Sequence, residues 1–199
     1  MPRASREQAS SNRVAIEESA SRLFRERGFG GVSVAEVMAD AGFTHGGFYG
    51  HFASKDELAA IACTRAFEDS LDRWKQRVAG QGDEASALGA LIDGYLAPRN
   101  LRAPGGACPS AALSNDVSRE GEDKPVRAAF VAGVKAQLDL LLSVQDPDRP
   151  PDTDKALVQL ATMVGALVLA RATAGDPISG DFVRAVRERF AGLVDEATV

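Results

Sequence analysis

Two groups of side chains have the types and spacing to support chemistry. The first is Cys108, which precedes Pro109 at a position where proline favours the start of a helix. A thiol at a helix N-terminus meets the positive end of the helix dipole, which favours the reactive thiolate. Cys108 is therefore a candidate sensor of electrophiles or oxidants, and the alternative is a small, inert helix cap. The other thiol, Cys63, follows apolar residues of a helical segment and is expected to be an inert core residue.

The second group lies near the N-terminus. Tyr49, His51 and Lys55 offer a hydroxyl, an imidazole and an ammonium, all of which can bind phosphate oxygens. Gly46 and Gly47 come just before them. Each glycine costs a helix up to about 1 kcal/mol relative to alanine, but lets the backbone lie close to another surface. The group indicates contact with a nucleic-acid backbone, and the alternative is that these are ordinary surface or core residues.

Other kinds of site find little support. Both histidines, His45 and His51, lie in that same N-terminal segment, so a thiol–imidazole pair with Cys108 would have to span the molecule. The sequence has no phosphate-binding loop, no dinucleotide glycine fingerprint and no metal-ligand spacing. We therefore expect no metal and no cofactor. An all-α enzyme and a ligand-binding bundle that does not bind DNA remain as alternative classes of protein.

The composition fits a globular protein of the cytoplasm. The 199 residues are 45% hydrophobic and 26% charged, and no signal peptide is recognisable. The longest apolar run, residues 163–170, is closed by Arg171 and is too short to cross a membrane. The net charge is −5, yet residues 1–55 carry seven basic and six acidic groups. This uneven balance fits a small DNA-contacting unit joined to an acidic body.

Helices must position these groups, because apolar residues recur at helical spacing and no alternating strand pattern occurs. Gly28 ends the first predicted helix. Ser33 and Glu36 form a capping box that begins the second. A third, short helix starts at Thr44. Together they predict a helix-turn-helix DNA-binding domain over residues 1–55, with the third helix placed in the major groove.

A longer helical region follows, so the expected fold is all-α with two domains. Ser54 begins a long helix that reaches about Val78, and residues 98–106 are expected to form a loop whose two final glycines make it flexible. Residues 56–199 are predicted to form a helical ligand-binding and dimerisation domain. Beyond the long helix, the predicted helices cover residues 85–97, 109–119, 125–144, 154–174 and 179–197.

Apolar and aromatic side chains of this second domain could line a cavity for a small ligand, although each alone could equally be core packing. Trp74 and Tyr95 would supply hydrogen bonds there. The predicted lining residues are Phe67, Leu71, Trp74, Leu88, Leu91, Tyr95 and Phe130.

The helix predicted over residues 154–174 is apolar around most of its circumference, and a single domain cannot easily bury every side of it. With the last helix, it predicts a four-helix interface between two copies of the chain. The alternative is burial within one protomer. The predicted interface residues are Leu157, Ala161, Val164, Gly165, Val168, Phe182, Val186 and Phe190.

The N-terminal segment resembles a known family over about residues 13–60. The resemblance rests on Gly28-Phe29, Ser33-Val34-Ala35-Glu36-Val37, Ala41-Gly42, Phe48-Tyr49, His51-Phe52, Lys55 and Leu58. These residues keep the order and spacing of the DNA-binding domain of the TetR/AcrR family of transcriptional repressors. The resemblance implies a homodimer that binds a pseudo-palindromic operator in double-stranded DNA and is released by a small-molecule inducer or an electrophile.

The same resemblance assigns roles by position. Those on the recognition helix are Thr44, His45, Gly46, Gly47 and Tyr49, and those at positions that commonly touch phosphate are Ser33, Tyr49, His51 and Lys55. Residues 105–113 and 165–172 are similar to a subgroup with a Gly-Cys-Pro-like start to its sixth helix. Some members of that broader group respond to electrophiles or oxidants, which implies such a role for Cys108.

Overall fold

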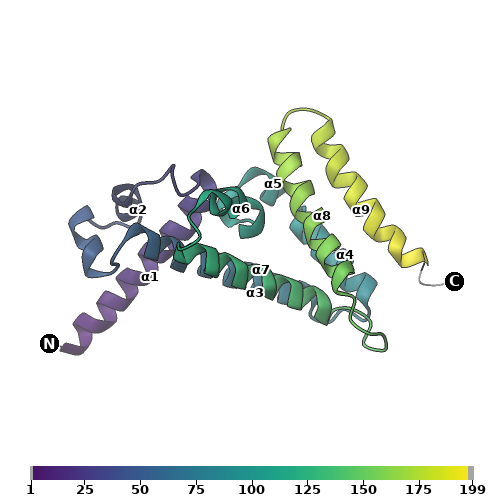
Figure 1. Cartoon of the computed structure of the whole chain (residues 1–199), viewed down its shortest axis with the longest axis horizontal. Helices are drawn as coiled ribbons and strands as arrows, with labels where there is room; N and C mark the ends of the chain where they lie inside the picture. The colour runs from purple at the N-terminus through teal and green to yellow at the C-terminus, as the bar shows by residue number, and fades with distance from the viewer. Residues whose placement is uncertain (1, 197–199) are drawn as a thin grey trace.

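The computed structural model describes residues 2–196, with side chains over residues 6–190, and the described chain is helical with no strand. This confirms the all-α fold. The elements are α1 (Pro2–Arg27), α2 (Val34–Asp40), the 3-10 helix η1 (His45–Gly50), α3 (Lys55–Val78), α4 (Glu84–Tyr95), α5 (Pro98–Arg102), the 3-10 turn η2 (Pro104–Gly106), α6 (Pro109–Arg119), α7 (Pro125–Ser143), α8 (Thr153–Ala172) and α9 (Ile178–Glu196). Figure 1 shows α2 near one end of the molecule and the α8–α9 pair at the other, with α3 and α7 side by side between them.

Local signals set most helix ends. Gly28 takes a φ of +74° directly after α1, a conformation that glycine adopts without steric cost. Ser33 begins α2 with both halves of the capping box in place, because its hydroxyl accepts from the Glu36 N–H and its own N–H donates to the Glu36 carboxylate. Ser54 caps α3 through the Glu57 N–H. The predicted starts of these helices are confirmed.

Two predictions about local structure were wrong in detail. The helix expected at Thr44 is a 3-10 helix, and the Thr44 side chain makes no capping hydrogen bond. Because three of its six residues are glycines, this segment is a poor α-helix former, and it adopts a short 3-10 helix instead. Residues 98–106 are not a loop but form α5 and η2, where the Asn100 amide donates to the Gly94 and Tyr95 carbonyls at 2.9 Å each.

Gly105 also departs from the expectation that it makes this segment flexible. It is buried, and a Cβ atom there would lie 2.3 Å from Glu26 Oε1 and 2.9 Å from Arg22 Cγ. Both of those side chains belong to α1. Gly105 therefore allows η2 to pack closely against α1, which ties the segment before α6 to the first helix.

The core has two parts, and α3 runs through both. The N-terminal cluster gathers α1, α2, η1 and the first half of α3, with Leu113 and Val117 of α6 and Val126 of α7. The second cluster gathers α4, α8 and α9 around Trp74 and Leu141. Because α3 continues from one cluster into the other, it joins the predicted DNA-binding unit rigidly to the C-terminal helices.

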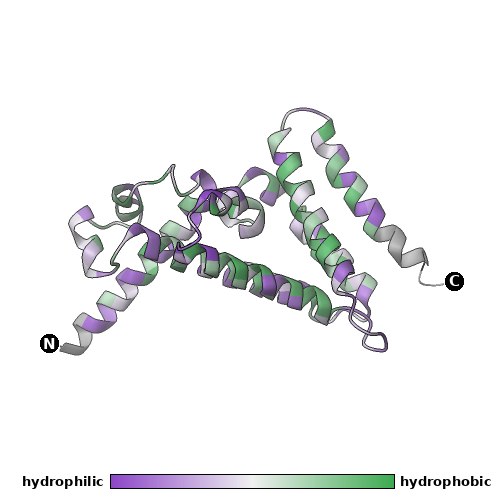
Figure 2. Cartoon of the chain, in the orientation of Figure 1, coloured by the Kyte–Doolittle hydropathy of each residue, from purple (hydrophilic) through white to green (hydrophobic). Residues whose placement is uncertain are grey.

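Helix α8 is apolar along much of its length, as Figure 2 shows. It is long and apolar enough to cross a membrane by length and composition, but one such helix is weak evidence for that. Its inner side carries Ala156, Leu160, Met163 and Leu167 in the second core cluster. Packing within the protomer thus explains the apolar residues on the inner side of α8, but not those on its outer side.

Candidate nucleic-acid interface and ligand region

The candidate DNA-contacting surface is held in place by one buried ring. Phe48, in the middle of η1, is fully buried and lies 5.5 Å from the Phe52 ring between centroids. Met38 of α2 packs close to η1, since a Cβ atom on Gly47 would lie 3.6 Å from its Cε. These contacts join α2 and η1 as the two helices of the predicted helix-turn-helix.

The other side of η1 faces solvent. Tyr49 is 70% exposed, an unusual position for a large aromatic side chain with no core role. No heavy atom would lie within 4 Å of a Cβ atom on Gly46, so the backbone there is open. The exposed residues at and around η1 include every predicted recognition-helix position: Thr44, His45, Gly46, Gly47 and Tyr49.

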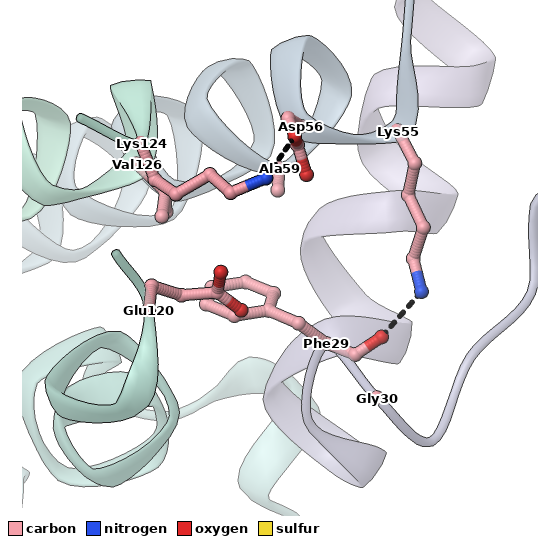
Figure 3. Close-up of a pocket in the computed structure, with 8 residues that line it drawn as sticks. All are labelled: Phe29, Gly30, Lys55, Asp56, Ala59, Glu120, Lys124 and Val126. Atoms are coloured by element: carbon pink, nitrogen blue, oxygen red, sulfur yellow. Dashed lines mark hydrogen bonds and ion pairs between the residues drawn. The ribbon is translucent and has the colours of Figure 1, made fainter. Parts of the chain in front are cut away.

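Some of the predicted phosphate-contacting groups have partners inside the protein. The Lys55 ammonium donates to the Phe29 carbonyl at 2.5 Å, across the turn that follows α1, as Figure 3 shows. The Ser33 hydroxyl donates to the Glu36 carboxylate at 2.8 Å while it caps α2. The half-buried His51 accepts a hydrogen bond from Arg13 at its carbonyl, and its ring lies beside that of Phe52 with the centroids 6.3 Å apart. Lys55 can reach a phosphate only by sharing or giving up the Phe29 carbonyl.

Charged contacts fix α2 against α1. The Asp40 carboxylate accepts from the Ser19 hydroxyl and from Arg22, each at 2.6 Å. These hydrogen bonds, from Ser19 first, hold the pKa of Asp40 below its ordinary value. Arg27 pairs with Glu36 at 2.9 Å. The placement of η1 therefore depends on both the apolar core and a set of polar contacts between α1 and α2.

Cys108 lies at the N-cap of α6, as predicted, but it is only 4% exposed. Its Sγ accepts a hydrogen bond from Gln137 Nε2 at 3.3 Å, and Gln137 Oε1 accepts another from Ser110 at 2.5 Å. The thiol is thus held in a buried polar cluster, and a reagent would reach it only after local opening. Its role as a sensor remains a prediction.

The predicted apolar cavity is filled by the side chains that were expected to line it. Trp74 and Tyr95 stack edge to face with centroids 5.9 Å apart, and Phe67 and Phe130 do so at 5.5 Å. Phe67 and Phe130 belong to the first core cluster, whereas Leu71, Trp74, Leu88, Leu91 and Tyr95 belong to the second. A cavity of about 10 Å³ lies beside Trp74 and Tyr95, which is room for about one water molecule. All seven residues therefore pack in or against the core, and they do not enclose a shared ligand cavity in this structure.

The residues predicted for the dimer interface differ in exposure between α8 and α9. On α8, Leu157 is 46% and Val168 39% exposed, Ala161 is exposed, and Val164 and Gly165 are half-buried. On α9, Phe190 is buried and Val186 packs against the protomer's own second core, while Phe182 is half-buried. Phe190 and Val186 therefore pack within the protomer, because α9 turns its apolar stripe toward α4 and α8, and their part in a dimer interface stays a prediction.

Sequence reasoning missed a group of arginines near Cys108. Arg73 and Arg77 are one turn apart on α3 and line the small cavity beside Tyr95. Their spacing of four residues was a usable signal, since it places both guanidinium groups on one face of the helix. The other two arginines near Cys108 are Arg25 and Arg171. Both are far from Cys108 in the sequence, so spacing could not have associated them with it.

The helix-turn-helix is shared with known regulators. Residues 16–61 match the family described as bacterial regulatory proteins, tetR family. TtgR, an HTH-type transcriptional regulator of Pseudomonas putida, is 34% identical over 94 residues, which span 46% of this chain and 42% of TtgR. Over a greater length, an uncharacterised HTH-type transcriptional regulator of Mycobacterium tuberculosis is 31% identical over 167 residues, which span 77% of this chain and 80% of that protein.

The fold is shared as well. A TetR-family regulator from Cytophaga hutchinsonii superposes with a TM-score of 0.77 at 20% identity, covering 93% of this chain and 96% of that one. Members of this group regulate transcription and are not enzymes, which removes the enzyme alternative. The exposed η1 surface, the buried Phe48 anchor and these similarities lead to one assignment: the chain belongs to the TetR family of bacterial transcriptional regulators.

Proposed function

We propose that this protein is a ligand-responsive repressor in the cytoplasm that binds a pseudo-palindromic operator as a homodimer. The observation that carries the proposal is the pairing of two surfaces within one chain. The glycine-rich η1 surface with its 70% exposed Tyr49 is shaped to approach DNA, and α8 keeps an exposed apolar side. A helix-turn-helix regulator needs a partner copy, because two recognition helices read two half-sites.

In the DNA complex, residues 1–55 supply the contacts. The open backbone at Gly46, next to the exposed Gly47, allows η1 to sit close to the groove. Thr44 and His45 are the side chains placed for base edges. Those proposed for the phosphates are Ser33, Tyr49, His51 and Lys55.

In the dimer, residues 56–199 supply the interface through α8. Small residues let two copies of α8 approach closely, and exposed apolar side chains give the free energy of association. The α8 residues proposed for this contact are Leu157, Ala161, Val164, Gly165 and Val168. From α9, the half-buried Phe182 remains a proposed contact, with Phe190 and Val186 supporting the helix from inside.

The first experiment selects bound duplexes from a random pool and determines the oligomeric state of the complex. We expect a dimer on a site with two symmetric half-sites, with recognition helices about 34–36 Å apart. Val158→Asp, at a position 65% exposed on α8, should give a monomer that binds the site weakly. Val131→Asp, at a 51% exposed position on α7, is the matched control and should remain a dimer. A monomeric wild-type protein, or a selected site without symmetry, contradicts the proposal.

The second experiment measures how DNA affinity depends on salt. A lysine that neutralises one phosphate contributes about 0.9 to the slope of log affinity against log salt. Lys55→Ala should lower the slope by about that amount, whereas Tyr49→Phe should weaken binding with the slope unchanged. Lys75→Ala, an exposed lysine at the far end of α3, is the control. An unchanged slope for Lys55→Ala would show that Lys55 stays on the Phe29 carbonyl and does not contact DNA.

The third experiment asks whether Cys108 is the responsive group. A thiol-reactive electrophile should release DNA from the wild-type protein and leave Cys108→Ser bound. If both proteins release DNA alike, Cys108 is not part of the response. The inducer would then be a molecule that binds without a covalent bond.

A further inference from the structure

Arginines near Cys108 and its neighbours form no ion pair within the described residues, although Asp69 and Glu26 act on Arg25 from a greater distance. Within the described residues, no carboxylate oxygen lies within 4.0 Å of the guanidinium groups of Arg25, Arg73, Arg77, Arg99 or Arg171. Many other described arginines do have such a partner, for example Arg22 with Asp40 and Arg187 with Asp93. In a protein of net charge −5, this local excess of positive charge is unlike the rest of the chain.

Two of these guanidinium groups line one small cleft. Arg73 and Arg77 of α3 border it together with Tyr95, Gly106 and Cys108, and Arg73 donates to the Gly106 carbonyl at 3.1 Å. Arg77 lies against α4 at Gly94, where a Cβ atom would come within 2.0 Å of its Nε.

Arg77 is held there despite an electrostatic cost. Burial first, and then the neighbouring charges of Arg99 and Arg73, lower the pKa of Arg77. Residue 94 must be small for Arg77 to occupy this place, and no carboxylate of the described residues forms an ion pair with its guanidinium group. An anion placed between Arg73 and Arg77 would relieve that cost.

The Tyr95 hydroxyl faces the same cleft and makes no hydrogen bond within the described residues. The side chain is 1% exposed, and a buried tyrosine hydroxyl usually has a partner. Burial first, and then the neighbouring Cys108, raise the pKa of Tyr95, so the hydroxyl keeps its proton. The Cys108 thiol is its one neighbouring polar group among these causes, and a thiol is a weak acceptor. A stronger acceptor at this place would find a buried donor beside two guanidinium groups that have no ion pair within the described residues.

We propose that this cleft binds the anionic group of a small molecule, a carboxylate or a phosphate, through Arg73, Arg77 and the Tyr95 hydroxyl. The inference rests on the proposed ligand-responsive function and names the chemistry of the ligand. The cavity of about 10 Å³ admits one oxygen atom of the anionic group to Tyr95. The remaining oxygens stay between the half-buried guanidinium groups, and the rest of the ligand lies at the mouth. Hydrogen bonds from guanidinium groups to such oxygens are short and charge-assisted.

The cleft is linked directly to α1. Arg25 of α1 is 7% exposed and donates to the Ala107 carbonyl at 3.0 Å, directly before Cys108. It also donates to the Ser21 carbonyl at 2.9 Å within α1. Burial, and then the charge of Arg73, lower the pKa of Arg25 to about 10. An anion at Arg73 would reduce this repulsion and change the contact between α1 and the start of α6.

Trp74 allows a direct test, because it is the only tryptophan of the chain and lines the cleft. Its fluorescence is followed while inorganic phosphate, or acetate in a separate titration, is added at constant ionic strength. We expect a saturable change with at least one of the two anions, and the stronger one identifies the ligand class. Arg77→Gln and Tyr95→Phe should each weaken the apparent affinity, the arginine change by about tenfold or more.

The control is Arg119→Gln, which removes one exposed positive charge at the end of α6. It should bind the anion as the wild-type protein does. Thermal unfolding without the anion verifies folding, and Arg77→Gln should be at least as stable as the wild-type protein, because it relieves repulsion. Arg73→Gln is the second variant if Arg77→Gln fails to fold. A change that does not saturate with either anion, or that is the same in Arg77→Gln and Arg119→Gln, overturns the proposal.

DNA binding is measured separately on the selected duplex. If the anion binds at Trp74 but no duplex is bound, the proposed repressor function fails and the anion site stands. If the duplex is bound but Trp74 does not respond to either anion, the anion site fails and the repressor function stands.

Discussion

Gly133 determines how closely α7 packs against α3, and replacing it with alanine gives a quantitative test of the fold. A Cβ atom at residue 133 would lie 2.2 Å from both Cγ and Cδ2 of Phe67. Carbon atoms in contact are about 3.5 Å apart, so the overlap is about 1.3 Å. Phe67 is 2% exposed and stacks edge to face on Phe130, so its ring has little room to move. Overpacking of this kind costs about 1–3 kcal/mol, and we expect the upper half of that range.

Gly89→Ala is the matched control. Gly89 lies in α4 with no heavy atom within 4 Å of a Cβ position, so alanine there should stabilise the helix by about 0.5–1 kcal/mol. Gly133→Ala gains the same helix term, so the difference between the two variants isolates the overpacking. We expect Gly133→Ala to unfold about 4–12 °C below Gly89→Ala, followed by circular dichroism at equal protein concentration. Equal midpoints would show that α7 does not approach α3 as closely as described.

Three further outcomes follow from the polar contacts and the buried thiol. The pKa of Asp40 is lower in the folded protein than the ordinary carboxyl value of 3.8. The stability that the Asp40 carboxylate contributes is therefore complete above pH 3.8 and is lost as the pH falls toward the pKa of the folded state. The stability of Asp40→Asn should depend less on pH than that of the wild-type protein in urea titrations between about pH 5 and 3. Ser33→Ala should lower stability by about 1 kcal/mol in the same titrations at neutral pH, because α2 loses its cap. Burial raises the pKa of the Cys63 thiol to about 12, so a thiol reagent at pH 8 should modify Cys63 only as fast as the protein unfolds.

Features that depend on neighbouring residues in the sequence could be predicted from it. The Ser33 cap, the end of α1 at Gly28 and the proline start of α6 each need only three or four residues, and all were located correctly. The exposed side of η1, the candidate DNA surface, was also predictable, because the same short segment holds the buried ring and the exposed polar groups. The exposed apolar side of α8 followed from its excess of apolar residues over what one domain can bury.

Features that depend on contacts between distant segments could not be predicted. Gly105 was expected to give flexibility, but its packing against Glu26 is visible only once η2 lies on α1. The aromatic residues predicted to line a cavity fill the space themselves, because composition does not reveal how side chains pack. Arg25 and the Ala107 carbonyl are 82 positions apart, so nothing local relates them. The candidate ligand site therefore emerged from the structure, whereas the candidate DNA surface emerged from the sequence.

The continuous α3 helix explains how these two surfaces can influence each other. Its 24 residues span about 36 Å, from Lys55 beside the DNA-binding unit to Trp74 and Arg77 beside the proposed anion site. The contact between Arg25 and Ala107 ties α1 to the segment before α6, and the ion pair between Lys124 and Asp56 ties the start of α7 to the first turn of α3. If an anion tilted α3 by about 5° relative to α8, η1 would move by about 3 Å over that length. Opposite movements in two protomers would change the recognition-helix spacing by about 6 Å, almost two base-pair steps of about 3.4 Å each. Under the proposed function, an anion that binds the tilted arrangement more tightly than the other would favour a spacing that no longer matches the two half-sites.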